Sequence, residues 1–396
     1  MMRTSHFRTL LAGAALATLA SPAFALDGAD LMAKLNATYA TSGVSISSTN
    51  VGVDGSTVTL EGAELTATGS DAPVKLGTIT MDGVEEDGDG GYTIETVSFE
   101  DINVTEKETT VTAKDLAITG VSIPGEVVAG TLESLMMYES ASSGPVTVSA
   151  NGKEVFSMSG MEANMTRMDD DAGLEFNATM SDLKADLTSV EDPKAKETLD
   201  KLALHSLEGK VSMSGSWELA TGKLTLDEYA FDFKDIGRLN LSLAFSGYTL
   251  DFLKSMQETL KAAESNPNKE EANAAMGMSM MGLVQQLTFN NASISFEDAS
   301  ITKKLLDYAG GEQGVTGDQM AQSLKGLVPL MIAQLNMPDL QNQISAAVNT
   351  YLDDPKSIRI SAEPKEPVPF PMIMGAAMGA PQTIPQVLGV SVTANQ

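Results

Sequence analysis

Between residues 44 and 187, apolar and polar side chains alternate with a period of two instead of the helical period of 3.6. Short alternating runs recur there, as in Val58-Thr59-Leu60, Val74-Lys75-Leu76, Ile79-Thr80-Met81, Val97-Ser98-Phe99 and Val111-Thr112-Ala113. Pairs such as Asp54-Gly55 and Asn151-Gly152 separate these runs. Alternation is typical of strands with one face in water, and Asp-Gly or Asn-Gly pairs favour tight hairpin turns. The pattern predicts a β-rich region of repeated hairpins over residues 26–190.

Residues 191–396 mix both periods and are predicted to form an α+β region that can continue the same sheet. Helices are expected at residues 194–204, 250–264, 274–287, 301–308, 316–335 and 340–352. Strands are expected at residues 210–219, 223–233, 239–245, 286–296, 357–362 and 387–393. Residues 267–273 are expected to form a charged loop between two of these helices.

Two long tracts of this region, residues 272–296 and 367–396, contain no charged side chain. Burial in a packed interior is one explanation, and an apolar groove wall or partner surface is the other. Five prolines exclude one continuous helix from the second tract, namely Pro367, Pro369, Pro371, Pro381 and Pro385.

The first 25 residues have the three-part pattern of a secretory signal peptide. Arg3 and Arg8 precede an apolar run, and Ala23-Phe24-Ala25 provides a small-x-small cleavage site. Because that run is about half the length of a membrane span, it is a poor anchor. We therefore expect cleavage after Ala25, a periplasmic location and no transmembrane segment in the mature chain.

Composition excludes several classes of function. The net charge is −28, and loss of the two signal-peptide arginines would make the mature acidic protein more negative still, which disfavours nucleic acid as a partner. The chain has no cysteine, and outside the signal peptide its one histidine is His205. A Ser-His-Asp hydrolase or a His/Cys zinc site is therefore not expected. We predict a protein that is not an enzyme and has no cofactor.

Two motifs offer weak metal-binding candidates. Met276, Met278, Met280 and Met281 supply soft thioether groups that suit Cu(I), although methionine also fills irregular apolar gaps. Residues 85–90, Glu-Glu-Asp-Gly-Asp-Gly, begin like a calcium loop, but the twelfth position is Thr96 and strands are predicted on both sides. We interpret this segment, and the Asp169-Asp170-Asp171 run, as turns first and weak cation sites second.

The strand-to-helix passage at residues 287–308 resembles uncharacterised bacterial envelope proteins of the AsmA-like and YdgA-like kind. It reads Leu-Thr-Phe-Asn-Asn-Ala-Ser-Ile-Ser-Phe-Glu-Asp-Ala-Ser and then Leu305-Leu306-Asp307-Tyr308. The signal-led N-terminus, the Thr/Ser-rich strands and Leu352-Asp353-Asp354-Pro355 add to the resemblance. It implies a long, curved β-sheet that forms an apolar groove, and in some relatives lipid movement between membranes. AsmA-like proteins usually keep an N-terminal membrane anchor, whereas a cleavage site is expected here.

These observations predict an α+β protein, with an extended, curved antiparallel β-sheet and helices from the C-terminal half packed on one face. The favoured hypothesis is a periplasmic protein whose β-sheet groove binds lipid acyl chains or an apolar segment of an envelope protein. Its candidate wall and lid residues are Leu60, Leu76, Met81, Phe99, Met281, Leu283, Met372 and Met374. The alternatives are an envelope scaffold or assembly factor without a small ligand, and a methionine-rich Cu(I) binder.

Overall fold

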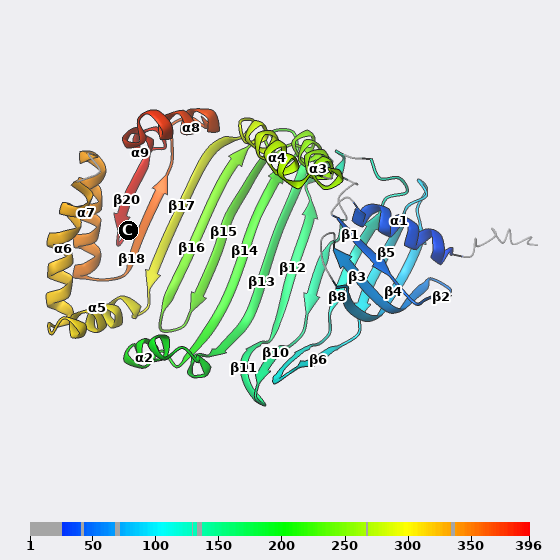
Figure 1. Ribbon diagram of the computed structural model, residues 1–396, viewed down its shortest axis with the longest axis horizontal. Coiled ribbons are helices and arrows are strands. Elements are labelled where there is room, and N and C mark those ends of the chain that lie inside the picture. Colours follow the sequence, from blue (N-terminus) through cyan, green and yellow to red (C-terminus); the bar gives the residue numbers. More distant parts are fainter. Residues whose placement is uncertain are drawn as a thin grey trace, which may run out of the picture.

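The computed structural model describes residues 26–40, 43–67, 72–128, 130–132, 137–266, 268–333 and 337–396. The predicted signal peptide, residues 1–25, lies outside the described residues, so its cleavage stays a prediction. One large antiparallel sheet dominates the fold, with helices along its margins (Figure 1). The expected α+β class is therefore confirmed.

After its opening helix α1 (Gly28–Ala40), the described part of the first region consists mainly of strands. They are β1 (Val44–Ser47), β2 (Asn50–Asp54), β3 (Thr57–Ala67), β4 (Val74–Glu86), β5 (Tyr92–Phe99), β6 (Ile102–Glu106), β7 (Thr109–Ala113), β8 (Ala117–Ile123), β9 (Ser140–Ser143), β10 (Val146–Ala150), β11 (Lys153–Met158), β12 (Gly160–Arg167) and β13 (Gly173–Asp186). The alternating pattern of residues 44–187 thus folds as strands.

The second region continues the same sheet, because β13 pairs along its length with β14 (Ser206–Glu218). The following strands are β15 (Lys223–Phe233), β16 (Gly237–Ser246), β17 (Thr288–Asp298), β18 (Ser357–Ala362), β19 (Val368–Pro369) and β20 (Val390–Ala394). Its helices are α2 (Pro193–Lys201), α3 (Leu250–Ser265), α4 (Lys269–Val284), α5 (Ile301–Glu312), α6 (Gly317–Ala333), α7 (Pro338–Asp353), α8 (Phe370–Gly379) and α9 (Ile384–Val387).

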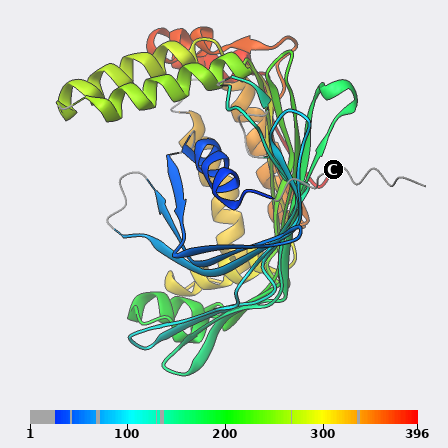
Figure 2. The same cartoon turned by 90° about the vertical axis from the view of Figure 1, so that its right-hand side faces the viewer.

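The sheet is a meander in which order along the chain follows order across the sheet. From β13 to β18 each strand pairs antiparallel with the next, and β20 pairs with β18. Four neighbouring long strands of the sheet are each broken once, and the breaks lie along one line across the sheet. They divide the long strands into β5 and β6, β7 and β8, β9 and β10, and β11 and β12. Below that line the β6–β7 and β10–β11 hairpins curve forward (Figure 2). In the tight turn between β10 and β11, Asn151 and Gly152 both have positive φ, as the Asn-Gly pair predicts.

A packed core lies between α1 and the first strands. Leu31 and Leu35 of α1 contact Val58, Leu60 and Ile79 in a cluster of buried side chains. The phenol of Tyr92 donates a 2.8 Å hydrogen bond to Asp30, which also accepts from Lys34. Burial and this contact with Asp30 raise the pKa of Tyr92, while the bond from Lys34 lowers the pKa of Asp30.

A second, smaller core holds the start of α3 on the sheet. Leu253 packs with Trp217 of β14 and Leu174 of β13, and the indole N–H of Trp217 donates to the carbonyl of Tyr248 at 2.8 Å. From this anchor α3 and α4 project forward as a helical hairpin (Figure 2). All the larger helices thus lie on one side of the sheet or along its margins.

Most predicted elements of the second region are confirmed, with differences at their ends. The charged loop expected at residues 267–273 was wrong in part, because α4 begins at Lys269. The Asn268 side chain caps it by accepting from the backbone N–H groups of Glu270 and Glu271. The strand expected from residue 387 begins at Val390, after the short helix α9. The proline-rich tract forms α8 and α9 with a break at residues 380–383, as its prolines require.

Candidate functional site

The candidate site is the concave face of the sheet from β12 to β20, which we call the trough floor. Strand register aligns one apolar row across it, from Met180 through Val211, Phe231, Leu239, Phe296 and Ile358. A parallel row follows Ala178, Met213, Tyr229, Leu241, Ile294, Ile360 and Val392. Because side chains alternate between faces, these residues share the face on which Trp217 contacts α3. The Tyr229 hydroxyl is the one polar side-chain group of these two rows.

The opposite, convex face carries polar side chains between those same rows. Register aligns Asn240, Ser295, Arg359 and Thr393 there. Ser242 and Ser293 are joined by a side-chain hydrogen bond, and Ser361 and Ser391 by another. Glu228 accepts from Ser212 and from Arg238, and these contacts lower the pKa of its carboxyl group. The sheet therefore separates a polar outer face from an apolar inner one.

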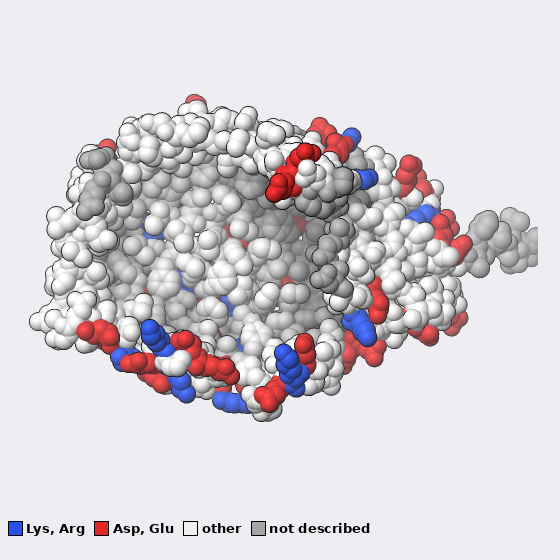
Figure 3. Space-filling model, in the orientation of Figure 1, with Lys and Arg blue, Asp and Glu red and all other residues white. Residues whose placement is uncertain are grey.

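The floor is open, unlike the interior of a packed domain. Large floor side chains on five different strands remain between 37 and 47% exposed, namely Met180, Tyr229, Leu243, Ile294 and Ile360. Figure 3 shows the corresponding hollow, bounded by helices and lined mainly by uncharged residues. Continuous exposed apolar surface of this kind is rare on soluble monomers and marks an interaction site.

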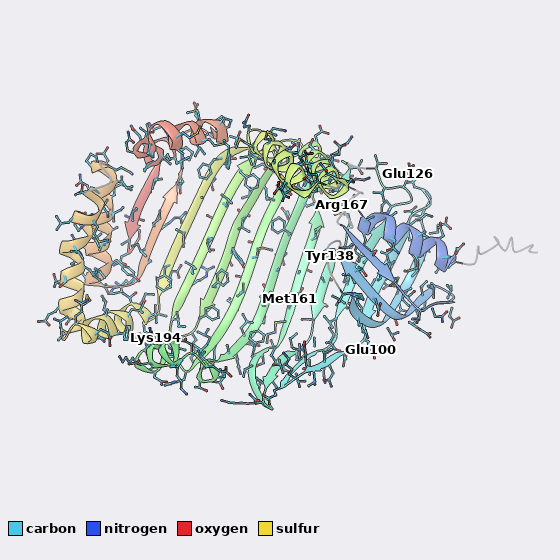
Figure 4. All side chains as sticks on the ribbon, in the orientation of Figure 1. Glu100, Glu126, Tyr138, Met161, Arg167 and Lys194 are labelled. Atoms are coloured by element: carbon cyan, nitrogen blue, oxygen red, sulfur yellow. The ribbon has the colours of Figure 1, made fainter. Side chains whose placement is uncertain are left out.

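The walls of the hollow come from helices at its margins. The α3–α4 hairpin, α8 and α9 border its upper side, α5, α6 and α7 one end, and α2 the lower side (Figure 1). Helix α7 also covers the outer edge of β20, where Gln343 accepts from the backbone N–H of Val392 at 3.3 Å. In Figure 4 Met161 lies on the floor, whereas Glu100, Glu126 and Lys194 lie at its margin.

The structure places the expected wall residues of the first region elsewhere. Leu60 and Met81 are buried beneath α1, and Leu76 and Phe99 pack against the same cluster. They fill a solid core and do not line the open floor. The sequence pattern did not predict helix α1, which covers them, because the alternation begins only at Val44.

The expected lid residues do lie near the trough. Met281 and Met372 are exposed on α4 and α8, Met374 is half-buried on α8, and Leu283 is buried at the end of α4. The residues that sequence reasoning missed are the floor positions of β13 to β18. The Leu239-Asn240-Leu241-Ser242-Leu243 alternation signals them, but it cannot say which strands stay uncovered.

The four methionines of α4 do not converge on one point. Residues three or four positions apart share one side of a helix, whereas residues two apart do not, so Met276 and Met280 share one side and Met278 and Met281 another. Met276 lines a cleft of about 420 Å³ between α3 and α4. A single Cu(I) site built from all four thioethers is therefore not formed by α4 alone.

The other candidate motifs form local structure. Asp87 of the Asp/Gly-rich hairpin accepts from the backbone N–H groups of Asp89 and Gly91, and His205 lies exposed beside Asp200. A hollow of about 900 Å³ at the bend between β5, β8 and β12 is lined partly by Glu85, Glu95 and Glu139. Among the described residues, however, no three His, Cys, Asp or Glu side chains are grouped to hold a metal ion.

Comparison with known proteins adds one match. Residues 230–395 match the model of a family described as an uncharacterised protein, and no curated protein matches the chain in sequence. The matched region runs from the end of β15 to β20 and so includes α3 to α9 and the last part of the floor. Within the part of the chain that the structure describes, no helix is both long and apolar enough to cross a membrane.

Proposed function

We propose that the trough binds the acyl chains of lipids and that the protein acts as a periplasmic lipid-binding protein. The observation that carries the proposal is the unbroken apolar floor, with large side chains left exposed on successive strands. Each methylene group moved from water onto such a surface contributes about 0.8 kcal/mol. The resemblance to AsmA-like and YdgA-like proteins supports the same function.

The dimensions of the floor suit hydrocarbon chains. Neighbouring strands lie about 4.8 Å apart, so the six strands from β13 to β18 span about 24 Å. One leaflet of a bilayer is about 15 Å of hydrocarbon, which is half of the roughly 30 Å core. An acyl chain therefore fits across the floor without leaving it.

The chemistry of the floor favours hydrocarbon over a peptide segment. A bound peptide brings backbone N–H and C=O groups, and each such group loses free energy if it is buried without a partner. The floor rows offer the Tyr229 hydroxyl alone, and α7 covers the β20 edge to which an added strand would pair. An acyl chain makes no such demand.

Native mass spectrometry of the protein purified from a bacterial envelope tests the proposal. We expect bound phospholipid or fatty acid, and at least a tenfold loss of affinity for a fluorescent fatty acid in Ile294→Asp. Tenfold corresponds to about 1.4 kcal/mol, less than the cost of burying an unpaired carboxylate against hydrocarbon. The matched control is Ser295→Asp, which adds the same charge one residue away, on the convex face opposite Arg359.

Ser295→Asp should retain lipid at the wild-type level. Protein that carries no lipid and binds no fatty acid would contradict the proposal and favour the scaffold hypothesis. Equal losses in the two variants would also contradict it, because they would show that the charge acts on folding and not on the floor.

A further inference from the structure

The two charge-free tracts of the sequence meet at the upper margin of the trough. The backbone N–H of Phe370, the first residue of α8, donates to the carbonyl of Leu287, just after α4, at 3.0 Å. Strand β19 pairs next to it with the start of β17. This contact joins the end of α4 to the start of α8, and we call the two helices the α4–α8 rim.

Both helices of the α4–α8 rim are apolar yet uncovered. After Glu271, α4 has no charged residue, and only Ala272 and Leu283 of its described side chains are buried. Helix α8 has neither a charged nor a buried residue. A helix that is apolar around its whole circumference normally lies inside a protein or a membrane. Here four methionines project into solvent with 57 to 84% of their surface exposed, namely Met278, Met281, Met372 and Met378.

Charge is distributed unequally between the two long margins. In Figure 3 the upper margin over α8 and α9 is almost entirely white, with a small acidic spot at its top edge, and acidic and basic residues appear on the α3–α4 tip and along the lower margin near α2. The charges nearest the rim in sequence are Glu363, Lys365 and Glu366, which follow β18. Beyond the first turn of α4, the rim is thus an uncharged surface on a protein of net charge −28.

We propose that the α4–α8 rim inserts into the interface of a neutral, zwitterionic phospholipid bilayer and so places the open trough against its lipid source. The role of this docking rests on the proposed lipid-binding function, but bilayer docking is measured separately from acyl-chain binding. The long, flexible thioether side chains adapt to disordered lipid, which presents no fixed complementary shape. A protein partner would instead be expected to meet aromatic and Arg anchors, and the two helices contain no Arg and one aromatic residue, Phe370.

The charge distribution also predicts the lipid preference. Because insertion depends on apolar contact, binding to phosphatidylcholine vesicles should change little with salt. Anionic phosphatidylglycerol should weaken binding at low salt, since the rest of the protein repels it, and salt should restore the binding. A protein held on the bilayer by electrostatic attraction would instead bind phosphatidylglycerol more strongly than phosphatidylcholine, and salt would weaken that binding.

Vesicle flotation with phosphatidylcholine tests the surface. We expect the wild type to float with the vesicles and the double variant Met278→Glu with Met378→Glu to lose at least fivefold of its bound fraction. The matched control is Leu327→Glu with Met331→Glu on α6, which adds the same charge at exposed side chains away from the rim. Equal loss in both double variants, or no flotation of the wild type, would overturn the proposal.

A fluorescence measurement keeps the test independent of the acidic variants. The chain contains no cysteine, so Met378→Cys can carry a single environment-sensitive fluorophore, with Met331→Cys as its control. We expect phosphatidylcholine vesicles to shift the emission to the blue at residue 378 and not at residue 331. Fatty-acid binding by the Met278→Glu/Met378→Glu protein without vesicles should stay normal. Loss of fatty-acid binding as well would contradict a separate docking role for the rim, whereas loss of vesicle binding alone would support that role.

Discussion

The indole N–H of Trp217 in β14 donates a 2.8 Å hydrogen bond to the backbone carbonyl of Tyr248, one residue before the cap of α3. The rings of the two residues also meet edge to face, with centroids 6.0 Å apart. Trp217 is the only tryptophan of the chain and is buried. This pair fixes the α3–α4 hairpin to the end of the trough floor.

Replacement of Trp217 by phenylalanine is expected to lower the free energy of unfolding by about 1–3 kcal/mol, because the part-buried hydrogen bond to the Tyr248 carbonyl is lost. The midpoint of urea unfolding, followed by circular dichroism, measures the loss. Tyr229→Phe is the control, since its hydroxyl lies in the open trough, and it should change stability by less than about 0.5 kcal/mol. Equal effects would show that the hydrogen bond does not anchor the hairpin.

Acid should weaken the attachment of the β10–β11 hairpin to the end of β13. The bond from Lys153, with further bonds from Thr188, lowers the pKa of Asp186 from 3.8 to about 2. A lowered pKa in the folded state stabilises the fold above the unfolded value, and that contribution disappears as the pH falls from 3.8 through 2. The difference in urea midpoint between wild type and Asp186→Asn should therefore be largest near neutral pH, and it should decrease as the pH falls through this window.

Lys153→Met removes the main cause of that shift and should show the same narrowing against wild type. A gap that stays constant with pH for both variants would contradict the assignment of this pair.

Substitution of Gly120 in β8 should destabilise the first region for two separable reasons. Its φ is +62°, and an added Cβ would lie 2.4 Å from Cγ of Glu139. Gly152 has φ of +75° with nothing within 4 Å, so Gly152→Ala reports the backbone strain alone, about 1 kcal/mol. Gly120→Ala should cost more than Gly152→Ala. Glu139→Ala in the same chain should recover part of the excess, because it removes Cγ and Cδ of Glu139 and leaves its Cβ 2.8 Å from the added methyl. Thermal unfolding of the three variants checks this order, and an unrescued loss would contradict it.

Local sequence predicted the sheet well because its turns carry their own signals. The strands Lys223–Phe233 and Ser357–Ala362 were predicted at their observed ends, since Thr221-Gly222 and Pro355 mark where pairing starts. The start of α4 was missed, because Lys269, Glu270 and Glu271 were interpreted as a charged loop. Asn268 instead caps a helix there, and acidic side chains favour its first turn.

The site was harder to predict, because alternation reveals an apolar face but not what covers it. Leu60 and Ile294 follow the same pattern in similar strands. Leu60 is fully buried in the core beneath α1, whereas the helices of the second region stand at the margins and leave Ile294 exposed. That difference arises from the placement of helices distant in sequence. The two charge-free tracts meet at the α4–α8 rim, on the margin of that exposed floor.

Photolabelling with a diazirine-bearing fatty acid tests the acyl-chain trough most directly. Irradiation of the complex followed by peptide mapping should place the label on floor side chains of β13 to β18, such as Leu243, Ile294 and Ile360. An excess of unlabelled fatty acid should compete it away. Label confined to the convex face or to the core beneath α1, or no competition, would contradict an acyl-chain site in the trough.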